Sequence, residues 1–142
     1  MSNLVKLTAD CIFCKIIRGQ IPSFKLVETE LTYSFLDIGP LSKGHSLIIP
    51  KYCGVKLADI PDEFLADAMP VAKKIAIATG AQDYNILQNN GEIAHQVVKH
   101  VHFHVIPKPE ASDKQGLVIG WPTQKPEMDE LKALHAEMLS KL

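Results

Sequence analysis

The sequence has little of several things that would place a protein in a class at once. Only three of its 142 residues are cysteines, and so small and odd a number does not predict a framework of disulfides. Its 15 basic and 16 acidic residues leave a net charge of −1, which gives no bulk attraction to nucleic acid or to an anionic membrane. No apolar run approaches the roughly 18 residues of a membrane span, and the N-terminus lacks the apolar core of a secretory signal. We therefore expect no nucleic-acid or membrane partner, and a cytoplasmic location in the reducing cytosol, with the nucleus as a second site.

What is present is typical of one folded domain. A hydrophobic content of 46% and a charged content of 22% are ordinary, and a chain of this length buries a sizeable core without staples. We expect the domain to span residues 10–122. Residues 1–9 are expected to form a flexible arm, and residues 123–142 a helical extension that packs on the domain or on a second copy.

The most informative stretch is residues 100–106, in which three histidines alternate with apolar residues as His-Val-His-Phe-His-Val-Ile. A β-strand alternates its side chains between two faces, so this spacing predicts three imidazoles on one face and Val101, Phe103 and Val105 on the other. Core packing explains such a row poorly, because a buried imidazole needs hydrogen-bond partners. The outer two would lie about 13 Å apart at ~3.3 Å per residue, so chemistry by one or two histidines is a better interpretation than one metal held by all three. Pro107 is expected to end the strand.

Around this stretch the chain alternates short strand-like and helix-like segments. Strands are expected at residues 24–28, 31–37, 45–50, 84–88 and 99–107, with a further short strand at 117–119. Helices are expected at residues 10–18, 61–80 and 128–142, and Pro70 should kink or split the long one. Short strands with helices inserted between them predict an α+β fold around an antiparallel sheet.

Two cysteines stand in the spacing Cys11-x₂-Cys14, which is the common half of a structural zinc site. Half a site is weak evidence, and a buried pair of reduced thiols is the simpler alternative. The third cysteine, Cys53, follows the strand expected at residues 45–50.

The pattern of the three histidines is the signature of the histidine-triad (HIT) family, and other blocks of the chain resemble that family in the same order. These blocks are residues 10–22, 35–38, 44–51 and 88–91, so that with the triad the resemblance covers roughly residues 10–107. The order of the blocks and the Gly-Trp-Pro at residues 120–122 resemble the Hint branch, and in detail its fungal members. The resemblance implies a five-stranded antiparallel sheet with one main helix and a C-terminal helix, and a homodimer with a continuous sheet.

The resemblance also assigns roles to the histidines. The middle histidine of the triad, His102, would be the nucleophile and form a nucleotidyl-histidine with an α-phosphate. His104 would touch the phosphate or protonate the leaving nitrogen, and His45 would be a further histidine near the phosphate. A neutral imidazole suits this work, because it attacks without first losing a proton and divides a hard displacement into two easier ones. Catalysis of this kind needs no cofactor.

Further positions match the nucleotide-binding residues of the family. Asp37 would accept the ribose hydroxyls, since a carboxylate can take two hydrogen bonds from a cis-diol, and Ile38 follows it. Asn89 would lie beside the phosphate, and Gln96 matches the loop before the triad. Taken alone, Asp37 and Asn89 would be turn or cap residues. The slot for the base would be formed by apolar side chains, which would otherwise be plain core: Ile12, Phe13, Ile16, Ile21, Phe35 and Leu47.

The chain departs from the family pattern just before the triad. Val97 stands where Hint proteins commonly have a serine near the leaving group, and valine cannot donate a hydrogen bond. His95 stands where glycine is usual. It is either a surface residue or an additional group of the site.

The resemblance extends the half site of the cysteines to a complete one. In some HIT proteins with this Cys-x₂-Cys, the position of Cys53 is a histidine ligand and the fourth ligand is the first triad histidine, here His100. Cys11, Cys14, Cys53 and His100 would then hold a structural zinc, and the alternative is three free thiols.

The function implied is hydrolysis of the P–N bond of adenosine 5′-monophosphoramidates, such as an AMP amide or AMP-lysine, to AMP and an amine. The purine nucleotide is thus the expected small-molecule partner. Two alternatives remain at this point. One is a dinucleoside polyphosphate hydrolase or nucleotidyltransferase that uses the same His102, and the other is a purine-nucleotide-sensing interaction protein.

Overall fold

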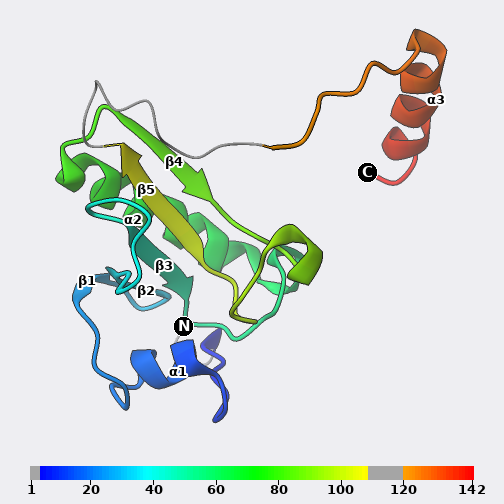
Figure 1. Cartoon of the computed structure of the whole chain (residues 1–142). Helices are drawn as coiled ribbons and strands as arrows, with labels where there is room; N and C mark the ends of the chain where they lie inside the picture. The colour runs from blue at the N-terminus through cyan, green and yellow to red at the C-terminus, as the bar shows by residue number, and fades with distance from the viewer. Residues whose placement is uncertain (1–3, 109–119) are drawn as a thin grey trace.

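Five antiparallel strands form one sheet in the order β1-β2-β3-β5-β4 (Figure 1). The structure is a computed structural model and describes residues 4–108 and 120–142. The strands are β1 (Lys25–Glu28), β2 (Thr32–Leu36), β3 (Ser46–Pro50), β4 (Asp83–Leu87) and β5 (Phe103–Lys108). The predicted α+β fold with a five-stranded antiparallel sheet is therefore confirmed, with strand ends that differ from the prediction mostly by one residue.

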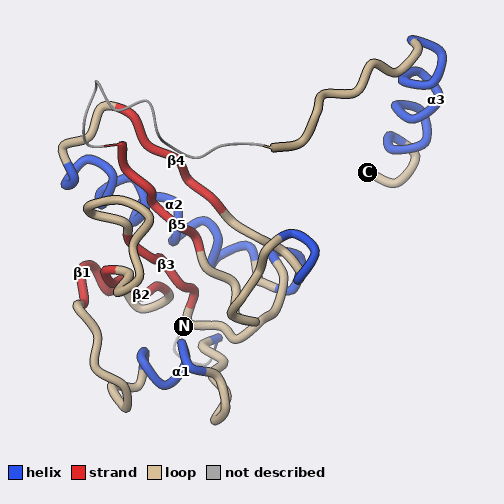
Figure 2. The backbone as a smooth tube through the Cα atoms, viewed as in Figure 1, coloured by secondary structure: helices blue, strands red, loops and turns tan. Residues whose placement is uncertain are grey.

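In the described part of the chain, three α-helices and two short 3₁₀ helices accompany the sheet, and Figure 2 shows the loops that join them. The helices are α1 (Ile12–Ile17), α2 (Asp62–Thr79) and α3 (Met128–Leu139), and the 3₁₀ helices are η2 (Leu57–Asp59) and η3 (Glu92–Ala94). The α2 helix is not split, because Pro70 lies on its exposed side. A backbone carbonyl that loses its N–H partner to proline can bond to water there.

The α2 helix covers one face of the sheet and makes a hydrophobic core with it. Its buried face meets β3 and β5, and this cluster includes Ile48 of β3 together with Val101, Phe103 and Val105. On the other face, α1 packs over Leu47 and Ile49. Neighbouring residues of one strand thus face opposite cores, as the period of two requires. The predicted split of the triad segment into apolar and imidazole faces follows the same rule.

The strand that carries the triad differs from its predicted range of 99–107. It begins at Phe103, where pairing with Ile48 starts, so His100 and His102 lie on the extended approach to β5. It also runs through Pro107, which we expected to end it. Pairing with β3 stops at Val105, so Pro107 lies where β5 has lost one neighbour and a missing N–H removes no hydrogen bond on that side.

The two ends of the chain behave differently. Lys6 of the predicted arm forms a parallel bridge with Tyr52, and the Cys53 N–H donates to the Lys6 carbonyl at 2.6 Å. Residues 120–142 are exposed throughout, and α3 lies apart from the sheet (Figure 1), so packing of this extension on a second copy stays a prediction. The strand predicted at 117–119 lies outside the described residues. None of the helices in the described ranges is long and apolar enough to cross a membrane.

Candidate active site

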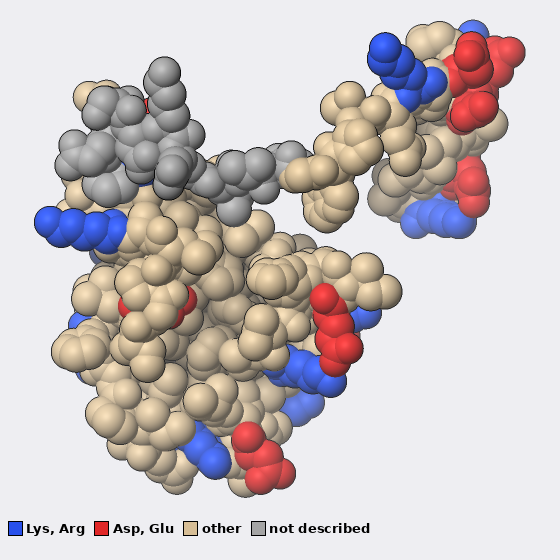
Figure 3. Space-filling view, viewed as in Figure 1, with Lys and Arg blue, Asp and Glu red and all other residues tan. Residues whose placement is uncertain are grey.

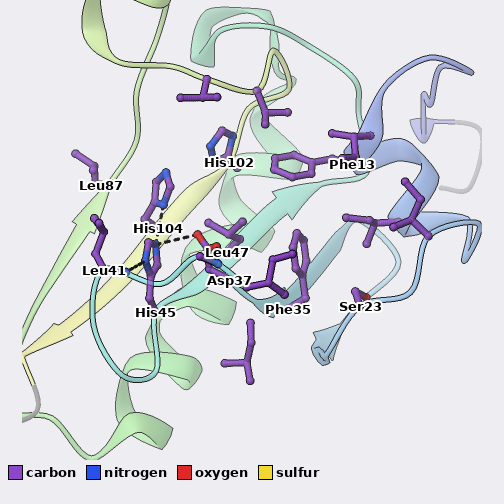
Figure 4. Close-up of a pocket in the computed structure, with 18 of the residues that line it drawn as sticks. Phe13, Ser23, Phe35, Asp37, Leu41, His45, Leu47, Leu87, His102 and His104 are labelled. Atoms are coloured by element: carbon purple, nitrogen blue, oxygen red, sulfur yellow. Dashed lines mark hydrogen bonds and ion pairs between the residues drawn. The ribbon is translucent and has the colours of Figure 1, made fainter.

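A cavity of about 460 Å³ opens on the face of the sheet that α2 does not cover. Two loops and the strands β2, β3 and β5 surround it, with α1 at one end (Figure 4). Thirteen of the predicted catalytic and nucleotide-binding residues were drawn from segments far apart in the sequence, and twelve of them line this one cavity. They are Ile12, Phe13, Ile16, Ile21, Phe35, Asp37, Ile38, His45, Leu47, Asn89, His102 and His104.

His102 is held in one tautomer by the backbone. Its Nδ1 lies 2.7 Å from the carbonyl oxygen of His100, and since a carbonyl only accepts, Nδ1 must carry the proton. The lone pair is therefore on Nε2. Burial lowers the pKa of His102 below its usual value, although the bond to the carbonyl opposes this, so the ring is neutral near pH 7. A buried neutral imidazole with a free Nε2 is what a nucleophile at phosphorus requires.

A chain of hydrogen bonds fixes the tautomer of His104 in the same way. The Leu41 N–H donates to Nδ1 of His45 at 3.0 Å, so the proton of His45 is on Nε2. This nitrogen lies 2.9 Å from Nδ1 of His104, which must accept, and the proton of His104 is therefore on its own Nε2 (Figure 4). Burial, with the neighbouring charges of His102 and His45, lowers the pKa of His104 to about 4. His104 thus offers an N–H donor.

Asp37 lies at the end of β2 beside these rings. One carboxylate oxygen accepts from the Gly39 N–H at 2.8 Å, and the other lies 3.6 Å from Nε2 of His45. Its negative charge raises the pKa values of His45, His102 and His104, against the larger opposite effect of burial. Asp37, His45 and His104 bring ligand atoms within 4.8 Å of one another. The facing nitrogens of His45 and His104 already share a hydrogen bond, and Asp37 lies beside that pair, which favours a proton-handling group over a metal site.

Gln96 is placed differently from the other predicted nucleotide-binding residues. It is buried outside the lining of this cavity, and its Oε1 accepts from the Gly91 N–H at 2.7 Å. Its Nε2 donates to the carbonyls of Val55 at 2.6 Å and Val98 at 3.1 Å. The side chain therefore braces the loop before the triad, and its predicted nucleotide contact stays untested.

Three contributors to the site were not identified from the sequence. Leu41 acts through its backbone N–H, and no side-chain pattern marks such a group. Val98 and Leu87 also line the cavity, and an apolar residue in a loop or at a strand end carries no signal of that role.

Behind the cavity, three cysteines and the first triad histidine form a compact cluster. The ligand atoms of Cys11, Cys14, Cys53 and His100 all lie within 4.8 Å of one another. Nδ1 of His100 is 3.2 Å from the sulfur of Cys11 and 3.6 Å from that of Cys14. In a tetrahedral zinc site with bonds of about 2.1–2.3 Å, ligand atoms are about 3.5–4 Å apart. The four side chains therefore fit a metal ion.

The orientation of His100 supports the same use of the cluster. Its Nε2 lies 2.9 Å from the Pro50 carbonyl and must donate to it, which leaves the lone pair of Nδ1 facing the sulfurs. Burial raises the pKa of Cys11 to about 12, so without a cation this thiol keeps its proton. A bound metal would reverse that by taking thiolates as ligands.

Comparisons with known proteins agree with this geometry. Residues 18–111 match the model of the HIT domain. Adenosine 5′-monophosphoramidase HNT1 of Saccharomyces cerevisiae is 61% identical over 142 residues, which cover all of this chain and 89% of that protein. Adenosine 5′-monophosphoramidase hnt1 of Schizosaccharomyces pombe is 53% identical, over 93% of this chain and 98% of that protein.

Solved structures show the same fold. The histidine triad nucleotide-binding protein from Candida albicans superposes with a TM-score of 0.85 at 51% identity, over 93% of this chain and 96% of that chain. A zinc-bound histidine triad family protein from Mycobacterium smegmatis has a TM-score of 0.71 at 34% identity, over 94% of this chain and 98% of that chain. Because the HIT domain model matches more than half of this chain, the chain belongs to the HIT family.

Proposed function

We propose that the protein is an adenosine 5′-monophosphoramidate hydrolase, which cleaves the P–N bond of AMP amides such as AMP-lysine to give AMP and an amine. The observation that carries the proposal is His102, whose Nδ1 is locked to a carbonyl while its neutral Nε2 faces a cavity with an apolar slot. The names of the fungal relatives support the same activity.

Substrate would lie along the cavity with its parts matched to the walls. The purine base would enter the apolar slot near Phe13 and Phe35, whose rings meet edge to face. Asp37 would accept the ribose hydroxyls, and Asn89 would lie beside the phosphate. This places the α-phosphate against His102, where the lone pair of Nε2 can attack.

The chemistry would proceed in two displacements. In the first, Nε2 of His102 bonds to phosphorus and the P–N bond to the amine breaks, which leaves a nucleotidyl-histidine. The departing nitrogen needs a proton, and the N–H of His104 is aimed from the end of the Leu41–His45–His104 chain. The negative phosphate beside His104 would raise the pKa of the His104 ring. Substrate binding would therefore favour the protonated ring, which can give its proton to the departing nitrogen. In the second displacement, water attacks phosphorus and gives a proton back to His104, while the bond from phosphorus to Nε2 of His102 breaks and AMP is released.

The test is release of AMP from an adenosine phosphoramidate, followed by chromatography, with His102→Ala as the matched control. Intact mass after an alkaline quench should reveal a nucleotidyl adduct on the wild-type chain and none on the variant. Absence of AMP release from the wild type would contradict the proposal. Dinucleoside polyphosphates would then be the next substrates to try, and micromolar nucleotide binding without turnover would favour the sensing role.

We also propose that Cys11, Cys14, Cys53 and His100 hold a structural zinc ion. The fit of their ligand atoms supports this, as does the zinc-bound relative of known structure. The ion would join α1, which carries a wall of the base slot, to the approach of the triad, and so brace the cavity. Metal analysis should find about one zinc per chain, and Cys11→Ser should lose it together with thermal stability. Three titratable thiols and no metal in the purified wild type would contradict the site.

A homodimer is the third part of the proposal. Among the described residues, strand β4 is an edge of the sheet with Tyr84 and Ile86 exposed on one of its faces, and edge strands of this kind invite pairing. Light scattering should give a mass near twice 15.7 kDa, and Ile86→Lys should shift it toward the monomer. A wild-type chain that stays monomeric at high concentration would contradict the dimer.

The proposed location is the cytosol, with the nucleus as a second site. The three free cysteines suit a reducing compartment. Imaging of a tagged chain in a living cell tests this, and a secretory distribution would contradict it.

A further inference from the structure

His95 has an unusual backbone conformation for its residue type. Its φ of 68° and ψ of 29° are left-handed, and it is the one non-glycine residue with positive φ in the ranges 4–108 and 120–142. Elsewhere in those ranges, positive φ is confined to glycines such as Gly44 and Gly91. A glycine would adopt this conformation without the steric cost that a Cβ brings. A side chain kept at this position despite that cost suggests a function for the imidazole.

The loop that presents His95 is firmly braced. Its N–H donates to the Glu92 carbonyl at 2.9 Å, and its carbonyl accepts from the Asn89 side chain at 3.3 Å. The buried Gln96 side chain then ties the same loop to Gly91, as described above. These hydrogen bonds fix the position of the His95 backbone, so its side chain starts from a fixed point in the wall of the cavity.

That point is the part of the cavity wall where the polar side chain of Asn89 also lies. His95 lines the wall there together with Asn89, Val97 and His104. A positive charge on His95 lowers the pKa of His104, after the larger effect of burial, which places the two rings within electrostatic reach. Val97 supplies no hydrogen-bond donor, so His95 and Asn89 are the polar side chains of the loop wall.

The charge of this end suits an acceptor or an anion. Among the described residues, Asp37 is the one carboxylate that lines the cavity, and it already meets the Gly39 N–H and His45. The other polar side chains at this end, His95, His104 and Asn89, can each donate a hydrogen bond. On the face shown in Figure 3, basic and acidic side chains are scattered over the sheet domain, and both kinds also occur on α3.

From this placement we propose that His95 is a specificity residue for the leaving amine, and that its ring donates to a carboxylate on that amine. The inference rests on the proposed function: the nucleoside fills the apolar slot, the phosphate meets His102, and the leaving group extends past His95. The favoured substrates are therefore adenosine phosphoramidates of amino acids, rather than of simple alkylamines.

Two matched substrates test the proposal, namely the AMP amides of glycine and of ethylamine, which differ in a carboxylate against a methyl group. We expect His95→Gly to lower kcat/KM about five- to tenfold on the glycine compound, and much less on the ethylamine compound. Glycine suits the left-handed backbone, so the variant should fold at least as well as the wild type. Ile93→Ala is the control, since Ile93 is fully exposed in the same loop and does not line the cavity.

The other outcomes are equally clear. An equal loss on both compounds, or no loss on the glycine compound, would overturn the role of His95 in choosing the amine. Calorimetry in a His102→Ala background gives a readout that does not need turnover. There, adding His95→Gly should weaken binding of the glycine compound alone. If the wild type hydrolyses neither compound, the proposed function fails, and the calorimetry still decides the role of His95.

Discussion

The two faces of the sheet are formed by the same strands but serve different purposes. On the α2 face, alternate residues such as Ile48 and Val105 meet a helix of 18 residues and are fully buried. On the other face, α1 has six residues and covers only part of the strands. The uncovered part is the cavity that His102 and His104 line. The comparison shows that the site lies on the face that the short helix α1 covers only in part. The long helix α2 holds the opposite face of the sheet in place.

The incomplete cover also sets the chemistry of the rings. His45, His102 and His104 are buried enough for desolvation to lower their pKa values, yet each lines an open cavity. Complete burial would have closed the site to substrate. Full exposure would have left the rings with the ordinary histidine pKa of about 6.5. If the two faces are as separate as this, substitutions on one should change catalysis and substitutions on the other should change stability.

The sharpest separation is expected from His102→Ala. Removing the nucleophile should lower kcat by at least about 10⁴-fold, while the apolar slot still binds AMP. Single-turnover hydrolysis and AMP titration measure the two effects. A variant that retains a tenth of the wild-type rate would show that another group attacks phosphorus.

The opposite result is expected from Phe64→Ala on the α2 face. Phe64 is fully buried in the core with Ile48 and Val105, so its loss should reduce the free energy of unfolding by about 3–5 kcal/mol. The kcat of the folded protein should not change. Urea denaturation gives the stability, and a rate normalised to the folded fraction gives the activity. A large loss of normalised kcat would mean that the two faces are coupled.

A smaller effect is expected from His45→Ala, which leaves the nucleophile but cuts the hydrogen-bond chain. Without the donor from His45, the proton of His104 is no longer confined to Nε2, and kcat should fall by about 10²-fold. Affinity for AMP should fall less than kcat, because His45 is not one of the apolar side chains of the base slot. Steady-state kcat and a separate AMP titration test this. An unchanged kcat would remove the chain from the mechanism.

The smallest effect is a dependence of stability on pH that belongs to the cavity face. His104 takes up a proton near pH 6.5 when unfolded and near pH 4 when folded, so the unfolded state binds more protons between these values. Stability is therefore expected to fall as the pH falls from about 6.5 toward 4. His104→Asn should show a shallower fall in urea titrations across that range. An unchanged slope in the variant would show that His104 does not contribute to it.

Much of the fold followed from local patterns. The period of two in residues 100–106 predicted which side chains face α2, and turn and cap residues placed the strands and helices to within a few residues. Such patterns work because they depend on neighbours in the chain. They failed at the start of β5 and at Pro107, where the pairing partner decides the outcome.

The candidate site, like the fold, was predictable from the sequence only in part. By itself, the sequence determined the residue types and the alternation of the triad, and family resemblance pointed to the residues that now share a cavity. Only the tertiary structure decided that Cys53 meets Cys11, that the Leu41 N–H selects the tautomer of His45, that Gln96 braces a loop, and that His95 is left-handed. These features depend on distances between atoms brought together from separate segments of the chain. No local periodicity encodes such distances, because packing of the whole domain sets them.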